Sequence, residues 1–317
     1  MSKQMPPGWW AAMANEVILG EAPKAVLTPS GGKPKGKDWP SFLKLAPGLI
    51  LLGIIFGVPL AWLLRMSFNT GLPGGGIEEG LSLNSYSTFF EASFNLELIW
   101  RTLGLGIVVT AGAFLLGYPL ALFLLRTQSK WKSLLLVLAL APLLTSAVVR
   151  TFGWIVILGD RGIINEALMG MGIISTPLSL ANNELGVAIA LTEILMPYMI
   201  LTVATGSSRL NDAVLEASAT LGGNTVQTFF RVILPLTLPG ILTGCLLVFV
   251  LTISSFVTPA LVGGGRVFLL ATEIYDQAVQ SLNWPLASAI SFILIALFAG
   301  VLVGYQRLMA RLDWNRS

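Results

Sequence analysis

Long apolar runs, separated by short polar segments, set the pattern of this chain. Four runs of transmembrane length contain no formal charge: Leu45–Leu64, Leu103–Leu125, Leu238–Val257 and Leu286–Tyr305. Two more, Leu134–Val149 and Leu185–Thr205, are apolar apart from a few polar positions, and the second contains Glu193. A helix needs about 20 apolar residues to cross a bilayer, whereas a strand of a membrane barrel needs only about 10. The pattern therefore predicts an all-α membrane protein with six transmembrane helices.

Composition supports this class and narrows the chemistry. Of 317 residues, 55% are apolar and 11% are charged, against roughly 25% charged in an average soluble domain. The chain has no histidine and one cysteine, Cys245. These counts exclude histidine-based catalysis, a disulfide framework and zinc or iron–sulfur sites built from several cysteines. We therefore expect no catalytic residues and no metal site, and the small net charge of +3 argues against a nucleic-acid partner.

The distribution of lysine and arginine predicts the orientation. Six spans place both termini on one side, and 14 of the 19 cations then fall on that side. The other side keeps five: Arg65, Arg101, Arg150, Arg161 and Arg266. Since positive charge collects on the cytoplasmic side, both termini are predicted to be cytoplasmic. The chain divides into an N-terminal tail (1–44, rich in proline and glycine and unlike a cleaved leader), a transmembrane domain (45–305) and a C-terminal tail (306–317).

A nucleotide-binding pattern is only nearly matched. Gly31 to Asp38 reads G-G-K-P-K-G-K-D, close to the phosphate-binding G-x-x-x-x-G-K-[ST] loop. Asp38 stands where the magnesium-binding hydroxyl should be, Pro34 removes a backbone amide, and no strand precedes the segment. The sequence thus gives this chain no evident means of hydrolysing ATP.

The cytoplasmic loop between the fourth and fifth spans (206–237) is predicted to be structured. Asp212 can cap a first helix, and Gly222-Gly223 can end it with a left-handed C-cap. A second helix is predicted from one apolar stripe at three- and four-residue spacing, formed by Val226, Phe229, Phe230 and Ile233. Pro235 and Pro239 would mark the return into the membrane. Such a short, small-residue helix on an aromatic support suits docking into a cleft of another protein.

This loop resembles the EAA loop of binding-protein-dependent ABC import permeases. The resemblance rests on Glu216-Ala217-Ser218, Gly222 and Val232-x-Leu234-Pro235, with Ser218 and Val232 departing mildly from the family pattern. Other stretches between about residues 45 and 310 resemble the spermidine/putrescine branch, and its first permease in particular: Gly117-Tyr118-Pro119-Leu120-Ala121, Arg150-Thr151-Phe152-Gly153-Trp154, Gly159 to Asn165, Thr176-Pro177-Leu178 and Asn283-Trp284-Pro285.

The resemblance implies a fold, partners and a mechanism. The fold would be the type I six-helix ABC importer permease, multi-pass in the bacterial inner membrane. The partners would be a second permease subunit, an ABC ATPase dimer, a periplasmic substrate-binding protein and membrane lipid, with ATP and magnesium on the ATPase and no cofactor bound by this chain. The chain would not itself be an enzyme. The residues that couple ATP hydrolysis to transport would be Glu216, Ala217, Ser218, Gly222, Leu234 and Pro235.

The substrate pathway is predicted from polar residues inside the spans. Glu193 is the only acidic residue within a predicted span, and intramembrane carboxylates usually face a cavity or a partner. We expect it to offset the lost hydration of a cationic amine; a structural role, protonated or bonded to a neighbouring helix, is the alternative. A polar run at the end of the fifth span and an outer tyrosine complete the candidate pathway: Ser254, Ser255, Thr258 and Tyr275. Hydroxyls of this kind also commonly bond only to their own helix.

The most favoured substrate is a polyamine such as putrescine or spermidine, and two kinds of alternative stay open. An opine, an aminophosphonate or another amino-acid-like substrate would sit more easily with Arg150 and Arg266. A stand-alone secondary transporter would need no ATPase, but the structured loop at 206–237 speaks against it. A membrane-embedded enzyme is disfavoured by the absence of histidine and of clustered intramembrane acids.

Overall fold

The computed structural model describes residues 39–314 except 73, 128, 208–209 and 211. Most of the predicted N-terminal tail, including the near-match to a phosphate-binding loop at 31–38, therefore lies outside the described residues. The chain forms two units, up to Gly57 and from Val58 onward. The first unit contains helix α2 (Trp39–Leu52) and a π-helical turn, η1 (Gly53–Gly57). From Leu45 onward their sequence has no polar side chain, which is typical of a helix surrounded by lipid.

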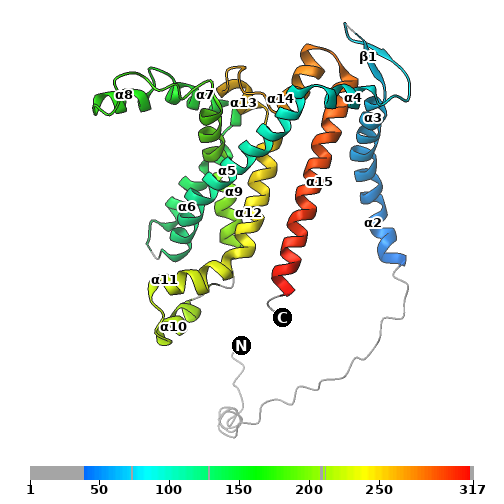
Figure 1. Cartoon of the computed structure of the whole chain (residues 1–317). Helices are drawn as coiled ribbons and strands as arrows, with labels where there is room; N and C mark the ends of the chain where they lie inside the picture. The colour runs from blue at the N-terminus through cyan, green and yellow to red at the C-terminus, as the bar shows by residue number, and fades with distance from the viewer. Residues whose placement is uncertain (1–38, 73, 128, 208–209, 211, 315–317) are drawn as a thin grey trace, which may run out of the picture. The chain divides into compact units, whose positions relative to one another are not determined.

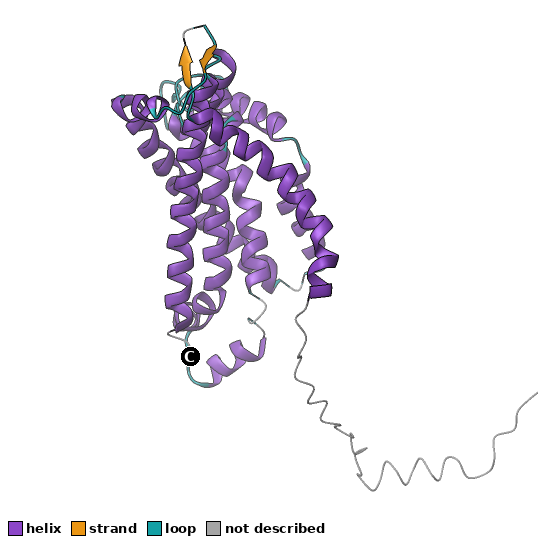
Figure 2. Ribbon diagram, turned by 90° about the vertical axis from the view of Figure 1, so that its right-hand side faces the viewer, coloured by secondary structure: helices purple, strands orange, loops and turns teal. Residues whose placement is uncertain are grey.

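The second unit is a helical bundle with a small hairpin at one end (Figures 1 and 2). Its elements up to the middle of the chain are α3 (Val58–Ser67), β1 (Thr70–Leu72), β2 (Gly76–Glu78), α4 (Asn84–Glu91), α5 (Ser93–Arg126), α6 (Lys132–Leu140), the 3-10 turn η2 (Ala141–Leu144), α7 (Ala147–Leu158) and α8 (Ile163–Gly170). The remaining elements are α9 (Glu184–Gly206), α10 (Asp212–Thr220), α11 (Thr225–Thr228), the π turn η3 (Phe229–Ile233), α12 (Leu234–Ser254), α13 (Val257–Val262), α14 (Leu270–Tyr275), the π turn η4 (Asp276–Gln280) and α15 (Trp284–Trp314).

Among the described residues, five helices are long and apolar enough to cross a membrane, and a bent helix pair brings the total to six. The five are Leu45–Ser67, Ser93–Arg126, Glu184–Gly206, Thr225–Ser254 and Trp284–Arg311. This confirms the predicted all-α class and five of the six spans.

The third predicted span is not one straight helix. The apolar run Leu134–Val149 contains a break after Leu144, and the helices on its two sides, Lys132–Leu144 and Ala147–Gly170, meet at 100°. Thr145 and Ser146 connect them in extended conformation or close to it, with ψ angles of 141° and 132°. Because the whole run is apolar, hydropathy alone predicted a single helix where two short ones exist.

Helices α5, α9 and α12 form the centre of the bundle, and small residues let them approach closely. A side-chain carbon on Gly206 of α9 would collide with the Cα atom of Gly240 on α12, and one on Gly112 of α5 would lie 2.9 Å from the Thr192 hydroxyl of α9. Buried apolar residues such as Val109, Leu191 and Val248 fill the space between the three helices. Since lipid gives apolar helices no hydrophobic reason to associate, close packing of small residues is the expected means of holding them together.

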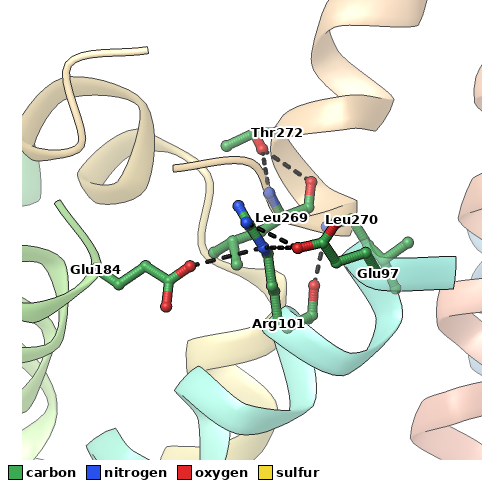
Figure 3. Close-up of polar contacts among 7 residues, drawn as sticks. Glu97, Arg101, Glu184, Leu269, Leu270 and Thr272 are labelled. Atoms are coloured by element: carbon green, nitrogen blue, oxygen red, sulfur yellow. Dashed lines mark hydrogen bonds and ion pairs between the residues drawn. The ribbon is translucent and has the colours of Figure 1, made fainter. Parts of the chain in front are cut away.

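Polar contacts fasten the end of the bundle that carries the β1–β2 hairpin, here called the hairpin end. Figure 3 shows Arg101 of α5 between two carboxylates, Glu97 at 2.8 Å and Glu184 at the start of α9 at 3.8 Å. Beside them, the backbone amide of Leu270 donates to the Thr102 hydroxyl at 3.0 Å, which attaches the start of α14 to α5. The hairpin end thereby joins α5, α9 and α14.

Buried Asn165 holds the segment around α8 at the same end. Its side-chain amide donates to the carbonyls of Gly159 and Leu178, both at 3.0 Å, and its oxygen accepts from the Leu178 amide at 2.8 Å. A buried amide side chain with these partners satisfied is a stable structural clamp. Asn165 therefore fixes the loop that returns from α8 to α9.

The hairpin and the α10–α11 segment lie at opposite ends of the second unit (Figure 1). The hairpin end also holds α4, α13 and α14, whereas the end here called the α10 end holds α10, α11 and the last turns of α15. From α5 onward the chain runs alternately between the two ends, and the α6–α7 pair makes one such passage despite its bend. This path agrees with a six-span topology.

Candidate functional site

A groove between α5, α7 and α9 contains the only carboxylate predicted within a span. Its volume is about 490 Å³, and its walls are mainly apolar side chains such as Val108, Leu116 and Ile189. Trp154, Thr192 and Glu193 are its members with hydrogen-bonding side chains. Apolar walls with a few polar groups are typical of small-molecule sites.

Trp154 and Glu193 lie close together within this groove. The indole Nε1 of Trp154 on α7 donates to the carboxylate Oε2 of Glu193 on α9 at 3.0 Å. Glu193 is half-buried, and Pro197, four residues later in α9, has no amide hydrogen to donate to the Glu193 backbone carbonyl. The backbone carbonyl of Glu193 lacks its usual helical donor, and its carboxylate can accept further hydrogen bonds. In an apolar surrounding, these acceptors suit a donor such as an ammonium group.

Sequence reasoning missed the role of Trp154 and misplaced Arg150. Arg150 was expected on the outer side beyond the end of a span, but it lies within α7 and is half-buried. Its guanidinium Nη1 donates to the backbone carbonyl of Ile194 at 3.5 Å, so it lies against the middle of α9. The 100° break after Leu144 explains the difference, since α7 begins only at Ala147 and carries Arg150 and Trp154 on one face, four residues apart.

The other predicted pathway residues lie at the junction of α12 and α13. The α12 helix ends at Ser254; Ser254 is exposed and Ser255 half-buried. Thr258 is only 2% exposed, and its hydroxyl lies 3.0 Å from the Thr151 hydroxyl of α7. Tyr275 of α14 is exposed and stacks on Phe256, with ring centroids 5.4 Å apart. The structure brings Tyr275 close to this junction, whereas Thr258 contributes its hydroxyl to a contact between α7 and α13.

The glycines that follow this junction form an ordered turn. Gly264 and Gly265 have left-handed backbone conformations, with φ of 56° and 72°. The Gly263 amide donates to the Pro259 carbonyl, and the Arg266 amide donates to the Gly263 carbonyl, both at 3.0 Å. The segment is therefore a hydrogen-bonded turn that favours glycine at positions 264 and 265.

At the α10 end, the predicted C-cap of the first loop helix is present in full. Gly222 has φ of 79°, its amide donates to the Ala219 carbonyl, and the Gly223 amide donates to the Ser218 carbonyl, each at 3.0 Å. This is the paired hydrogen bonding of a Schellman motif. The helix α10 begins at Asp212, whose side chain is not among those described, so its capping role stays a prediction.

The second loop helix differs from its prediction. Residues 225–254 form one continuous helix, in which α11, the π turn η3 and α12 follow without a break at Pro235 or Pro239. The predicted apolar stripe is divided between two faces. Phe229 and Ile233 point inward, whereas the side chains of Val226 and Phe230 are exposed. An unforeseen capping box starts this helix, formed by Asn224 and Gln227. The loop helix is therefore a rigid extension of the fifth span.

Three of the six predicted coupling residues line a pocket of about 360 Å³ between α10 and this extension. Ala217, Ser218 and Gly222 line it together with Gln227 and Arg231. Ser218 also connects the two helices, since its hydroxyl lies 2.8 Å from the Thr228 hydroxyl. Glu216 and Ala217 are exposed on α10. Leu234 and Pro235, which are half-buried, lie in the first turn of α12.

Comparison with known proteins gives a consistent picture. Residues 113–313 match the family described as the binding-protein-dependent transport system inner membrane component. The chain is 36% identical over 268 residues to the spermidine/putrescine transport system permease protein PotB of Haemophilus influenzae, covering 84% of this chain and 93% of that protein. It is 31% identical to the inner membrane ABC transporter permease protein YdcU of Escherichia coli, covering 89% and 95%.

A solved structure supports the fold. A bacterial alginate ABC transporter in complex with an alginate pentasaccharide-bound periplasmic protein contains a chain that superposes with a TM-score of 0.72 at 17% identity, covering 86% of this chain and 95% of that one. At this identity the likeness concerns the fold alone.

Proposed function

Because the chain belongs to the family of binding-protein-dependent transport system inner membrane components, we propose that it works as one of two permease subunits that import a polyamine into the cytoplasm. Family membership makes it a multi-pass permease component of the inner membrane and gives it a fold shared with ABC transporters. The proposal adds the substrate, the second permease, the ABC ATPase dimer that holds ATP and magnesium, and the cytoplasmic placement of the α10 end.

The α10–α11 segment is the observation that carries this proposal. Glu216 and Ala217 are exposed on a short helix that is closed by the Schellman turn at Gly222 and bonded through Ser218 to the extended fifth span. A partner that pushes on α10 would move α12 as well, because residues 225–254 form one helix. This is how ATPase closure would reach the transmembrane helices without any nucleotide site on this chain.

Two observations favour a polyamine as the substrate. Relatives that span most of the chain carry spermidine/putrescine transport in their names. The groove is also lined by the Glu193 carboxylate and by the Trp154 indole that bonds it. Carboxylates offset the lost hydration of ammonium groups, and aromatic faces attract them. We therefore propose that the pathway includes Glu193, followed by Ser254, Ser255 and Tyr275. Thr258 would reach it only after its contact with Thr151 opens.

One observation favours a second candidate, a zwitterionic substrate of the opine, aminophosphonate or amino-acid type. Arg150 brings a positive charge to the level of Glu193 within the membrane. A molecule with both an ammonium group and an anionic group would satisfy both charges. Uptake assays with amines and with amino acids of matched length separate the two candidates.

The experiment that tests the coupling role reverses the charge of Glu216. The complete complex, with Glu216→Lys in this chain, is expected to retain the ATPase poorly and to lose substrate uptake about tenfold or more, because the reversed charge must enter the partner's cleft. ATPase retention is measured by co-purification, and uptake in vesicles loaded with ATP. The control is Glu166→Lys on α8, which is also an exposed glutamate but lies at the hairpin end. Normal retention and uptake by the Glu216 variant would refute the proposal.

A further inference from the structure

Arg150 is a charged residue inside the membrane-spanning part of the bundle, and import of a polyamine by itself gives it no role. It lies on α7, half-buried, with Nη1 donating to the Ile194 carbonyl and with a buried Nε that has no hydrogen-bond partner. Among the residues that the structure describes, the ion pairs within 4.0 Å involve Arg101 with Glu97 and Glu184, and none includes Arg150. Its positive charge is thus not cancelled by a contacting carboxylate.

Arg150 does not line the groove itself, but it lies one turn before Trp154, which does. Arg150 and Trp154 are one turn apart on α7, and they contact consecutive residues of α9: Trp154 bonds the Glu193 carboxylate, and Arg150 bonds the Ile194 carbonyl. Neighbouring positions one turn apart have Cβ atoms roughly 5–6 Å apart. Any substrate ammonium bound by Glu193 would therefore feel a fixed positive charge at short range, in a surrounding that screens it far less than water does.

We infer that Arg150 is a specificity-determining residue that limits how many positive charges a substrate can bring to the Glu193 groove. One ammonium group gains from Glu193 more than it loses to Arg150, because it contacts the acid directly. Each further ammonium group of a longer polyamine has no second carboxylate in the groove and meets only the repulsion of Arg150. The permease would accordingly favour diamines over triamines and tetraamines. The inference rests on the proposed polyamine import.

A role in packing alone makes a different prediction. If Arg150 merely ties α7 to α9 through the Ile194 carbonyl, its loss would slow every substrate alike. A charge filter would instead change the ratio between substrates of different charge. The ratio of uptake rates between two substrates of different charge would therefore stay constant if Arg150 had only a structural role.

The test measures uptake of a linear diamine and a linear triamine by the reconstituted complete complex, each at saturating concentration with the same binding protein. Because the binding protein is unchanged, its own preference cancels when variants are compared with the natural sequence. For Arg150→Gln we expect the triamine-to-diamine uptake ratio to rise about tenfold, since one unit charge at short range in a partly screened medium has an effect of this order. For Arg150→Lys, which keeps the charge but not the forked hydrogen bonding, the ratio should stay near that of the natural sequence.

The outcomes are distinct. An unchanged ratio in Arg150→Gln, or equal ratios in Arg150→Gln and Arg150→Lys that both differ from the natural one, would overturn the charge filter while leaving polyamine import intact. An ω-amino acid of the same length is assayed alongside the amines. If the natural complex moves that amino acid and neither amine, the proposed polyamine function itself fails, and the inference with it.

Discussion

A lone carboxylate in an apolar groove must be stabilised either by protein donors or by the cations that visit it. The protein supplies Glu193 with one donor that the structure shows, the Trp154 indole at 3.0 Å. A carboxylate accepts about four hydrogen bonds, so Glu193 keeps capacity for further donors in the groove that it lines. The charge of Glu193 and its remaining hydrogen-bonding capacity are the features that link the fold to a cationic substrate.

Replacing Glu193 by glutamine removes the charge and keeps the shape. For Glu193→Gln we expect amine uptake to fall about tenfold or more, because a charge-assisted hydrogen bond worth roughly 1.5–3 kcal/mol becomes a neutral one. Co-purification of the complex should not change. Uptake is measured in vesicles, with Glu91→Gln on the exposed part of α4 as the matched control. Full activity of the Glu193 variant would remove this residue from the pathway.

The position of Glu193 could be predicted from sequence, whereas its surroundings could not. A single acid in an apolar run is visible in the sequence itself. Its partner Trp154 and its neighbour Arg150 come from another helix, and their distance from Glu193 depends on the bend after Leu144. Nothing in local hydropathy distinguishes a bent apolar segment from a straight one. Residue types were thus readable from the sequence, but their juxtaposition required the packing of α7 on α9.

Among the elements, the crossing of α9 and α12 lies directly next to the loop that carries α10. Gly206 is the last residue of α9, and a side-chain carbon there would lie 2.8 Å from the Gly240 amide nitrogen of α12. The two helices that flank α10 therefore touch through their backbones. A motion that reaches α12 from α10 is therefore passed on to α9 through this contact.

A methyl group at Gly206 should separate the two helices. For Gly206→Ala we expect the complex to lose about 1–3 kcal/mol of stability from overpacking, seen as a lower midpoint temperature of thermal unfolding in detergent. Transport per ATP hydrolysed should fall too, because the contact between the flanking helices is loosened.

Gly104→Ala on α5 is the control for this change, since no atom lies within 4 Å of the added carbon. It should leave the midpoint temperature unchanged or raise it slightly, as expected for glycine replaced by alanine in a helix. A stability loss of similar size in both variants would contradict the crossing as the cause.

The helical elements show why hydropathy predicted the existence of the spans better than the positions at which they begin and end. Pro235 and Pro239 were expected to mark the return of the chain into the membrane, and proline inside a helix usually kinks or breaks it. The π turn η3 immediately before Pro235 widens the helix where the proline ring would otherwise meet the carbonyl four residues earlier, so the helix continues. In contrast, Gly222-Gly223 was correctly predicted as a stop, because the left-handed conformation depends on the local residue type. Features that depend on the residues of a single turn, such as a glycine C-cap, could be predicted from the sequence. Features that depend on helix geometry over several turns could not.

For the molecule as a whole, the number of spans depends on whether the broken pair α6–α7 crosses the membrane or re-enters it. If the pair crosses, Ser129 before α6 and Glu166 on α8 lie on opposite sides, and the protein has six spans. If the pair re-enters, both lie on the same side and the spans number five. The path of α5 to α9 in Figure 1, with α6 starting toward the α10 end and α7 ending toward the hairpin end, favours crossing.

Single-cysteine labelling decides between these topologies, since Cys245 is the chain's one cysteine. In a Cys245→Ser background that still imports substrate, we introduce Ser129→Cys, Glu166→Cys, Thr220→Cys or Ser281→Cys, all at exposed positions. A membrane-impermeant maleimide should label positions 166 and 281 in intact spheroplasts, and positions 129 and 220 only after lysis, because lysines and arginines gather at the α10 end. Labelling of 129 and 166 from the same side would mean that α6–α7 re-enters. Labelling of 220 in intact spheroplasts would place α10 outside, where no ATPase could reach it.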